Sequence, residues 1–123
     1  MDFNGHKPIY LQIYDHISEC IISGKYNEGD RIMSVRELGV ELGVNPNTIM
    51  RSFELLQNKG IIANKRGIGF HVCENAKSNI LSEQRELFIN QELPEIFKKM
   101  SLYNISDEEF IRLHNEQKKG KQY

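Results

Sequence analysis

Apolar side chains recur at helical spacing three times within the first 60 residues. The first stretch predicts a helix over about 9–23 that ends at Gly24. Its apolar stripe consists of Ile9, Ile13, Ile17, Cys20 and Ile21. The second stretch begins after Ser34, which has the capping-box spacing with Glu37, so that each residue can satisfy the amide of the other. Gly43 ends this helix after about two turns.

A third helix is predicted directly after this short one. Asn45 is a typical N-cap residue, and Pro46 suits the first helical position. The buried stripe of the helix is expected to contain Ile49, Phe53 and Leu56, and Gly60 closes it. Two helices separated only by a tight turn have the helix-turn-helix layout. In that layout the first residues of the later helix can enter a DNA major groove.

Two short strand patterns follow the third helix. Residues 61–63 and 70–73 are mostly apolar and include β-branched and aromatic side chains, and the stretch 64–69 between them is basic and contains Gly67 and Gly69. A hairpin in this position is a wing. Before it, Arg31 begins a short extended segment over 31–33. The N-terminal part of the chain is therefore predicted to be a winged helix-turn-helix domain, which we place at residues 1–76.

The remaining residues, 77–123, have a mainly helical pattern. Pro94 predicts a kink or break near 91–94, and Ser106 starts a capping box for a last helix over about 107–118. Apolar faces on so short a segment form either a small intramolecular core or, as we expect, an intermolecular dimer core. The expected dimerisation residues are Leu81, Leu87, Phe88, Ile96, Phe97, Phe110 and Leu113. The predicted fold class is mainly α with a small β-hairpin: a winged helix-turn-helix followed by a short helical dimerisation tail.

Composition excludes several other classes of protein. The chain has 123 residues, a net charge of −1 and 39% hydrophobic residues, which is ordinary for a globular protein. No apolar run is long enough for a membrane span, and the polar start does not resemble a secretory signal, so we expect a cytoplasmic protein with no membrane partner. The two cysteines make no disulfide framework, and the histidines show no metal-ligand spacing. No nucleophile constellation or phosphate loop is present, so neither an enzyme nor a cofactor is expected.

The near-neutral charge conceals a basic segment. Residues 31–66 contain six Lys+Arg against three Asp+Glu, which leaves a local net charge of +3, whereas the first 30 residues hold five acids and two lysines. Such a window usually forms solvated surface, but here it contains both helix-turn-helix helices and the wing. It can therefore present one positive face to nucleic acid.

The motifs, taken in order, resemble the GntR family of bacterial transcription regulators. The matching segments are residues 8–13, 22–24, 29–32, 34–38, 43–48, 60–62 and 67–69. The Asn45-Pro46-Asn47-Thr48 sequence and the short helical tail resemble the YtrA-type subgroup. This resemblance implies a homodimer that binds operator DNA through winged helices, more often as a repressor than as an activator. The tail would mainly dimerise, and the regulated genes could encode membrane transporters.

The resemblance also implies DNA contacts. It places Arg36 over the groove, where an arginine reads guanine, and sets the wing tip against the DNA backbone or minor groove. The expected DNA-binding residues are Ser34, Arg36, Asn45, Asn47, Thr48, Arg51, Lys65, Arg66 and Gly67. Ser34 and Asn45 could instead serve only as helix caps. The chain departs from the family pattern at Met33, usually a proline, and at Pro46, where many relatives have a base-contacting arginine.

The alternative function is a winged helix that binds another protein without specific DNA readout. Such a module would have an apolar recognition-helix surface and a wing without bases. Arg36, Arg51, Lys65 and Arg66 argue against it. The sequence alone identifies neither an operator nor a small-molecule effector.

Overall fold

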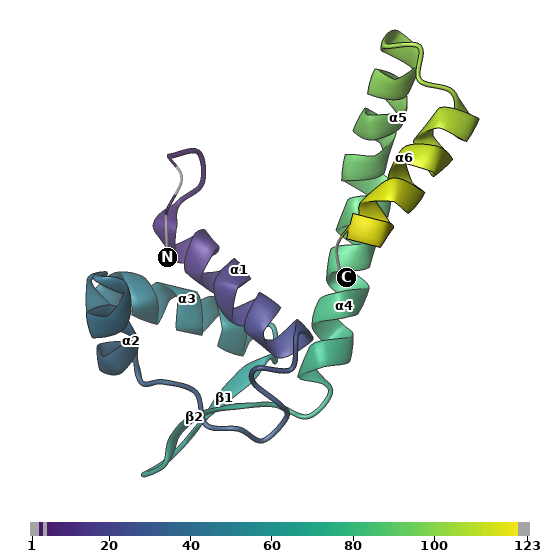
Figure 1. Cartoon of the computed structure of the whole chain (residues 1–123). Coiled ribbons are helices and arrows are strands. Elements are labelled where there is room, and N and C mark those ends of the chain that lie inside the picture. The colour runs from purple at the N-terminus through teal and green to yellow at the C-terminus, as the bar shows by residue number, and fades with distance from the viewer. Residues whose placement is uncertain (1–2, 4, 121–123) are drawn as a thin grey trace. The chain divides into compact units, whose positions relative to one another are not determined.

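The structure, a computed structural model, describes residue 3 and residues 5–120 and divides into two compact units, Met1–Glu83 and Gln84–Tyr123 (Figure 1). The first unit contains three helices and a two-stranded antiparallel hairpin, followed by most of a fourth helix. These elements are α1 (Ile9–Ile22), α2 (Val35–Leu42), α3 (Pro46–Asn58), β1 (Ile62–Lys65), β2 (Gly69–Val72) and α4 (Ala76–Leu87). This order confirms the predicted winged helix-turn-helix class.

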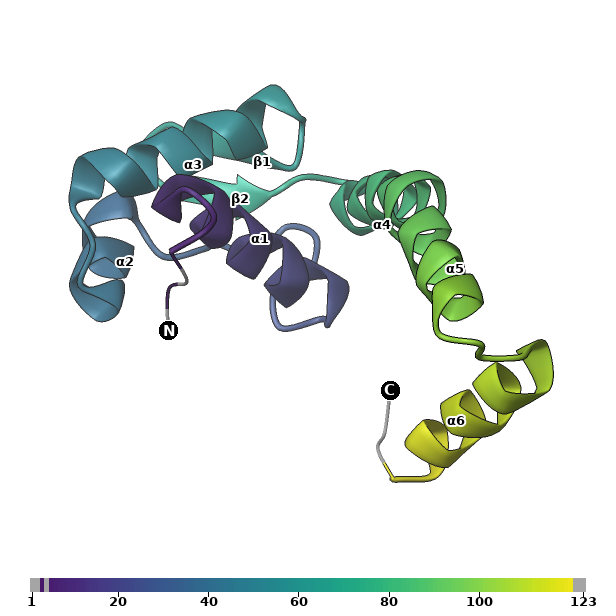
Figure 2. The same cartoon turned by 90° about the horizontal axis from the view of Figure 1, so that it is seen from above.

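The core of the first unit forms where α1 and α2 pack against α3 (Figure 2). All three predicted core residues of α3, Ile49, Phe53 and Leu56, are fully buried. Phe53 meets the ring of Phe70 from β2 edge to face, with the ring centroids 4.8 Å apart. The predicted stripe of α1 is also buried except at its first residue, Ile9. Hydrophobic burial at helical spacing therefore determines both the helices and their packing.

The hairpin pairs Ile62 with Val72 and Lys65 with Gly69, and it projects beyond the helices (Figure 1). The strand boundaries differ from the predicted 61–63 and 70–73, because pairing continues outward to Lys65 and Gly69. The predicted extended segment at Arg31 is confirmed. It bridges to β2 at His71, and the amide that follows it, from Ile32, donates to the Phe70 carbonyl at 3.0 Å.

Core residues continue into α4. Ala76 and Ile80 are buried and belong to the cluster that α1 and α3 form. Lys59, just after α3, forms an ion pair with Glu83 of α4 and lies 5.0 Å from the centre of the Tyr14 ring. The first unit therefore holds the beginning of α4 through both apolar and charged contacts.

The second unit contains the end of α4, followed by a π-helical turn (Phe88–Glu92), α5 (Leu93–Leu102) and α6 (Asp107–Gly120). The irregularity predicted from Pro94 is present, but it lies in the turn just before this residue. The Leu93 amide donates to Phe88, five residues back, and Pro94 has no amide with which to continue a regular α-helical pattern. Of the capping box predicted for the last helix, the side-chain half is present, since the Glu109 amide donates to Ser106 Oγ at 3.1 Å.

Within the described residues, no helix is both long and apolar enough to cross a membrane.

Candidate nucleic-acid interface

The N-terminus of α2 is fixed by the predicted capping box. The Glu37 amide donates to Ser34 Oγ at 3.0 Å, and the Ser34 amide donates to the Glu37 carboxylate at 3.2 Å. The hydrogen bonds from Ser34, followed by the interaction with Arg31, lower the pKa of Glu37. The Ser34 hydroxyl therefore has a capping role. Arg36 lies in the same first turn of the helix, and its side chain is exposed.

Arg31, which sequence reasoning did not assign to the site, connects the wing to this cap. Its Nε donates to the Ile68 carbonyl at 3.2 Å, and its Nη2 donates to the Glu37 carboxylate, also at 3.2 Å. One guanidinium thus joins the wing tip to the beginning of α2. The sequence placed Arg31 in the basic window but carried no signal that it would bridge 37 residues to Ile68.

The turn between α2 and α3 is unusually close-packed at Gly39. The Val44 amide donates to the Gly39 carbonyl at 2.9 Å, and a β-carbon on Gly39 would lie only 2.9 Å from the Val44 carbonyl oxygen. Only glycine lets the chain after α2 pass this close to the helix. Gly39 therefore sets the spacing between the two helices.

The beginning of α3 has the predicted cap. Asn45 Oδ1 accepts from the Asn47 amide at 2.8 Å, so part of the Asn45 side chain is committed to the cap. Asn47 is exposed and Thr48 is half-buried. Pro46 occupies the first turn of the helix, as expected. The N-terminus of α3 thus presents short polar side chains with hydrogen-bonding groups that suit phosphate or base edges.

Arg51, one turn later, is exposed and its guanidinium lies 3.9 Å from the centre of the Tyr10 ring. The Tyr10 backbone is itself attached to α3, since Ser52 Oγ donates to its carbonyl at 2.7 Å. The stacking restricts the arginine side chain without removing its charge. Tyr10 is a second positioning residue that sequence reasoning missed, because nothing in the spacing brings it to Arg51.

The wing tip carries the other predicted cations. Lys65 is the last residue of β1, Arg66 follows it in the turn, and both are exposed. Gly67 has φ +80°, a conformation that disfavours other residues, and nothing lies within 4 Å of where its β-carbon would be. The tip therefore offers an unobstructed backbone next to two cations, as a phosphate contact requires.

The four predicted cations at these three places differ from Arg31 in their ion pairing. Among the described residues, Arg36, Arg51, Lys65 and Arg66 form no ion pair, whereas Arg31 pairs with Glu37. Within the same described part of the chain, no cluster of three or more potential ligands could hold a metal ion.

Residues 9–72 match the sequence profile of the bacterial regulatory proteins of the gntR family. An uncharacterised HTH-type transcriptional regulator of Bacillus subtilis, YhcF, is 34% identical over 89% of this chain and 88% of its own length. The HTH-type transcriptional repressor YtrA of the same organism is 34% identical over 78% of this chain and 73% of its own length.

Solved structures agree with the sequence match. A putative transcriptional regulator of the GntR family from Bacteroides thetaiotaomicron is similar with a TM-score of 0.73 and 43% identity, covering 90% of this chain and 96% of that one. The DNA-binding domain of AraR in complex with operator ORR3 is similar with a TM-score of 0.54 and 27% identity, covering 59% of this chain and 88% of that one.

Proposed function

Because this chain belongs to the gntR family of bacterial transcription regulators, we propose that it is a homodimeric repressor that binds a palindromic operator. Members of this family are DNA-binding regulators, not enzymes. The observation that carries the proposal is a set of four exposed cations in the first turn of α2, on α3 and at the wing tip, none of which forms an ion pair within the described part of the chain. These are Arg36, Arg51, Lys65 and Arg66.

The proposed contacts divide into two kinds. Arg36, which is exposed and has no carboxylate partner among residues 3 and 5–120, would make a bidentate contact with a guanine edge in the major groove. Arg51, Lys65 and Arg66, together with the polar groups of Asn47, Thr48 and the caps, would bind phosphates and position the domain. Base readout then depends mainly on α2 and the start of α3, and the wing adds affinity.

The second unit supports the homodimer. Among its described residues, 84–120, no side chain is buried, although many are apolar. Six of the seven predicted dimerisation residues are exposed large hydrophobics: Leu87, Phe88, Ile96, Phe97, Phe110 and Leu113. The seventh, Leu81, is half-buried within the first unit. So much uncovered apolar surface suits a second copy of the chain.

Repression rests on a relative, since YtrA of B. subtilis is named as a repressor. Transporter control rests on the YtrA-type resemblance of the sequence. A twofold dimer with one winged helix per protomer predicts a palindrome with half-sites about one or more helical turns apart. A regulator that binds bacterial chromosomal DNA acts in the cytoplasm, where we place the protein.

Substituting Arg36→Ala tests the DNA contact. We expect operator affinity to fall by about 1–3 kcal/mol, or roughly 5- to 150-fold, and specificity at one base position to relax. Lys77→Ala, which removes an exposed cation from α4, is the matched control and should leave affinity nearly unchanged. Fluorescence anisotropy with operator and scrambled duplexes measures both quantities. If Arg36→Ala retained wild-type affinity and selectivity, its assignment would be refuted.

Substituting Phe97→Asp tests the dimer. Phe97 is 54% exposed on α5, so in the single chain a charge there disturbs little. In a dimer core, however, the aspartate would be desolvated, and we expect sedimentation to show a monomer. The neighbouring exposed residue provides the control, since Lys98→Asp should remain dimeric. A Phe97→Asp variant that sediments as a dimer would exclude this face of α5 from the interface.

A further inference from the structure

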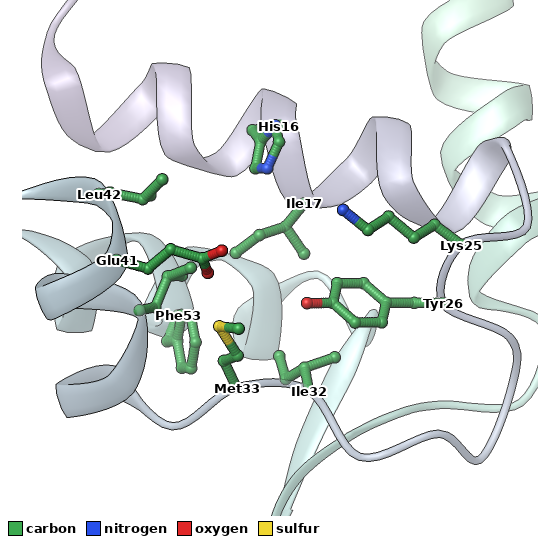
Figure 3. A pocket seen from close by; sticks show the side chains of 10 residues that line it. His16, Ile17, Lys25, Tyr26, Ile32, Met33, Glu41, Leu42 and Phe53 are labelled. Carbon is green, nitrogen blue, oxygen red and sulfur yellow. The ribbon is translucent and has the colours of Figure 1, made fainter. Parts of the chain in front are cut away.

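A cavity of about 580 Å³ lies within the first unit, between α1, α2 and the loop that connects them (Figure 3). Helix α1 contributes His16 and Ile17, and α2 contributes Glu41 and Leu42. Its size is within the range of small-molecule sites, roughly 300–1,000 Å³. None of the residues assigned above to DNA binding lines this cavity, although α2 contributes to both.

The floor of the cavity is apolar. Ile17, Ile32 and Phe53 are almost completely buried, and Met33 and Leu42 are half-buried beside them. Figure 3 shows the Phe53 ring and the Met33 thioether on the side of the cavity nearest α2. Such a surface suits an aliphatic or aromatic group of a ligand, and the methionine can adapt to its shape.

Charged and polar groups of opposite character face the same space. Figure 3 shows the Lys25 ammonium and the Tyr26 hydroxyl directed into the cavity from the loop, and the Glu41 carboxylate directed into it from α2. His16 lies above them on α1. Among the described residues, neither Lys25 nor Glu41 forms an ion pair. Burial, with smaller effects from Cys20 and Glu41, raises the pKa of Tyr26, whereas a hydrogen bond with the Met33 backbone lowers it.

We propose that this cavity binds a small zwitterion with an apolar side chain, namely an amino acid or short peptide. The ammonium of the ligand would pair with Glu41, its carboxylate with Lys25 and the Tyr26 hydroxyl, and its side chain with the floor near Phe53. An uncharged apolar ligand would leave Lys25 and Glu41 unused, and a simple anion would face the Glu41 carboxylate. The unpaired opposite charges therefore favour the zwitterion.

Binding would affect α2, which carries Glu41 and also Arg36. A ligand held between Lys25 and Glu41 connects the loop to α2 and so favours one position of that helix. If operator binding requires a different position, the ligand weakens DNA binding, and DNA weakens ligand binding by the same factor. This regulatory consequence rests on the proposed function, whereas binding itself does not.

The test is a ¹H–¹⁵N NMR titration of the full chain, without DNA, using L-phenylalanine and L-leucyl-L-phenylalanine as probes. We expect saturable shifts of the amides of residues 25–33 and 38–42. Lys25→Met and Glu41→Gln should each weaken binding about tenfold or more, since each removes one charged partner. Glu54→Gln, which removes an exposed carboxylate from α3 outside the cavity, is the control and should bind as the wild type does.

Blocked probes assign each charge. Glu41→Gln should lower the affinity for L-phenylalanine. It should hardly change the affinity for N-acetyl-L-phenylalanine, because this probe lacks the ammonium that Glu41 would bind. Lys25→Met should likewise hardly change the affinity for L-phenylalaninamide, because this probe lacks the carboxylate that Lys25 would bind. No saturable shift with either zwitterion up to about 10 mM, or equal binding by the variants, would overturn the proposal. A protein that binds these probes but no operator would instead refute the proposed function alone.

Discussion

Gly39→Ala is expected to destabilise the protein, although the substitution improves helix propensity. In an unobstructed helix position, alanine is about 1 kcal/mol more favourable than glycine. In this helix the new methyl would lie 2.9 Å from the Val44 carbonyl oxygen, and this backbone atom cannot move without displacing the turn before α3. Overpacking of this kind costs about 1–3 kcal/mol. The net expectation is a loss of roughly 1 kcal/mol, since the steric cost exceeds the gain in propensity.

Urea denaturation followed by circular dichroism, at a fixed protein concentration, measures this loss as a change in midpoint at constant slope. Val40→Ala is the matched control, because Val40 is adjacent in the same helix and 82% exposed. This control should be neutral or slightly stabilising. We also expect Gly39→Ala to weaken operator binding more than its stability loss explains, because it moves α3 relative to α2. If Gly39→Ala were stabilising by about 1 kcal/mol, the close approach would not exist in solution.

Two further predictions concern the groups that hold the predicted DNA contacts in place. The hydrogen bonds from Ser34, and then the interaction with Arg31, lower the pKa of Glu37. The contribution of this carboxylate to stability is therefore present above the ordinary carboxyl pKa of about 4.3 and is lost as the pH falls through the lowered pKa. Urea denaturation from pH 3 to pH 6 should show the free energies of unfolding of wild type and Glu37→Gln converging at low pH, and a constant difference between them would contradict this. Tyr10→Leu removes the ring beside Arg51 and should weaken operator binding by about 0.5–1 kcal/mol. In an Arg51→Ala background the same change should have almost no effect on anisotropy-measured affinity, whereas additive losses would show that Tyr10 does not act through Arg51.

Local signals in the sequence predicted most of the first unit. The stripes of α1 and α3, the capping box at Ser34 and the hairpin all depend on residues close together in the chain, and the structure contains each of them. In the second unit, the side-chain half of the capping box predicted at Ser106 is present. The predicted ends of the two strands were less accurate than those of the helices. Strand pairing continues outward to Lys65 and Gly69, beyond the apolar residues from which the strands were predicted.

Features that depend on distant contacts were not predictable. The link from Arg31 to Ile68 and the stacking of Arg51 on Tyr10 join residues 37 and 41 positions apart, and no periodicity encodes such pairs. The π-helical turn before Pro94 was predicted only as an irregularity. Because Pro94 lacks a backbone amide, the sequence indicates that the regular α-helical hydrogen bonding is interrupted, but it does not indicate which hydrogen bonds form instead. The cavity beside Glu41 arises from the packing of α1, α2, α3 and the loop between α1 and α2, and it has no counterpart in any single motif.

The most direct test of sequence-specific recognition by a dimer is selection of bound duplexes from a random DNA pool by the full-length protein. We predict enrichment of one palindromic sequence with two identical half-sites about one or more helical turns apart. The Arg36→Ala variant should lose the preference at one symmetric pair of positions. A pool that remains random after repeated selection at low salt, or a single half-site without its symmetric copy, would contradict this function.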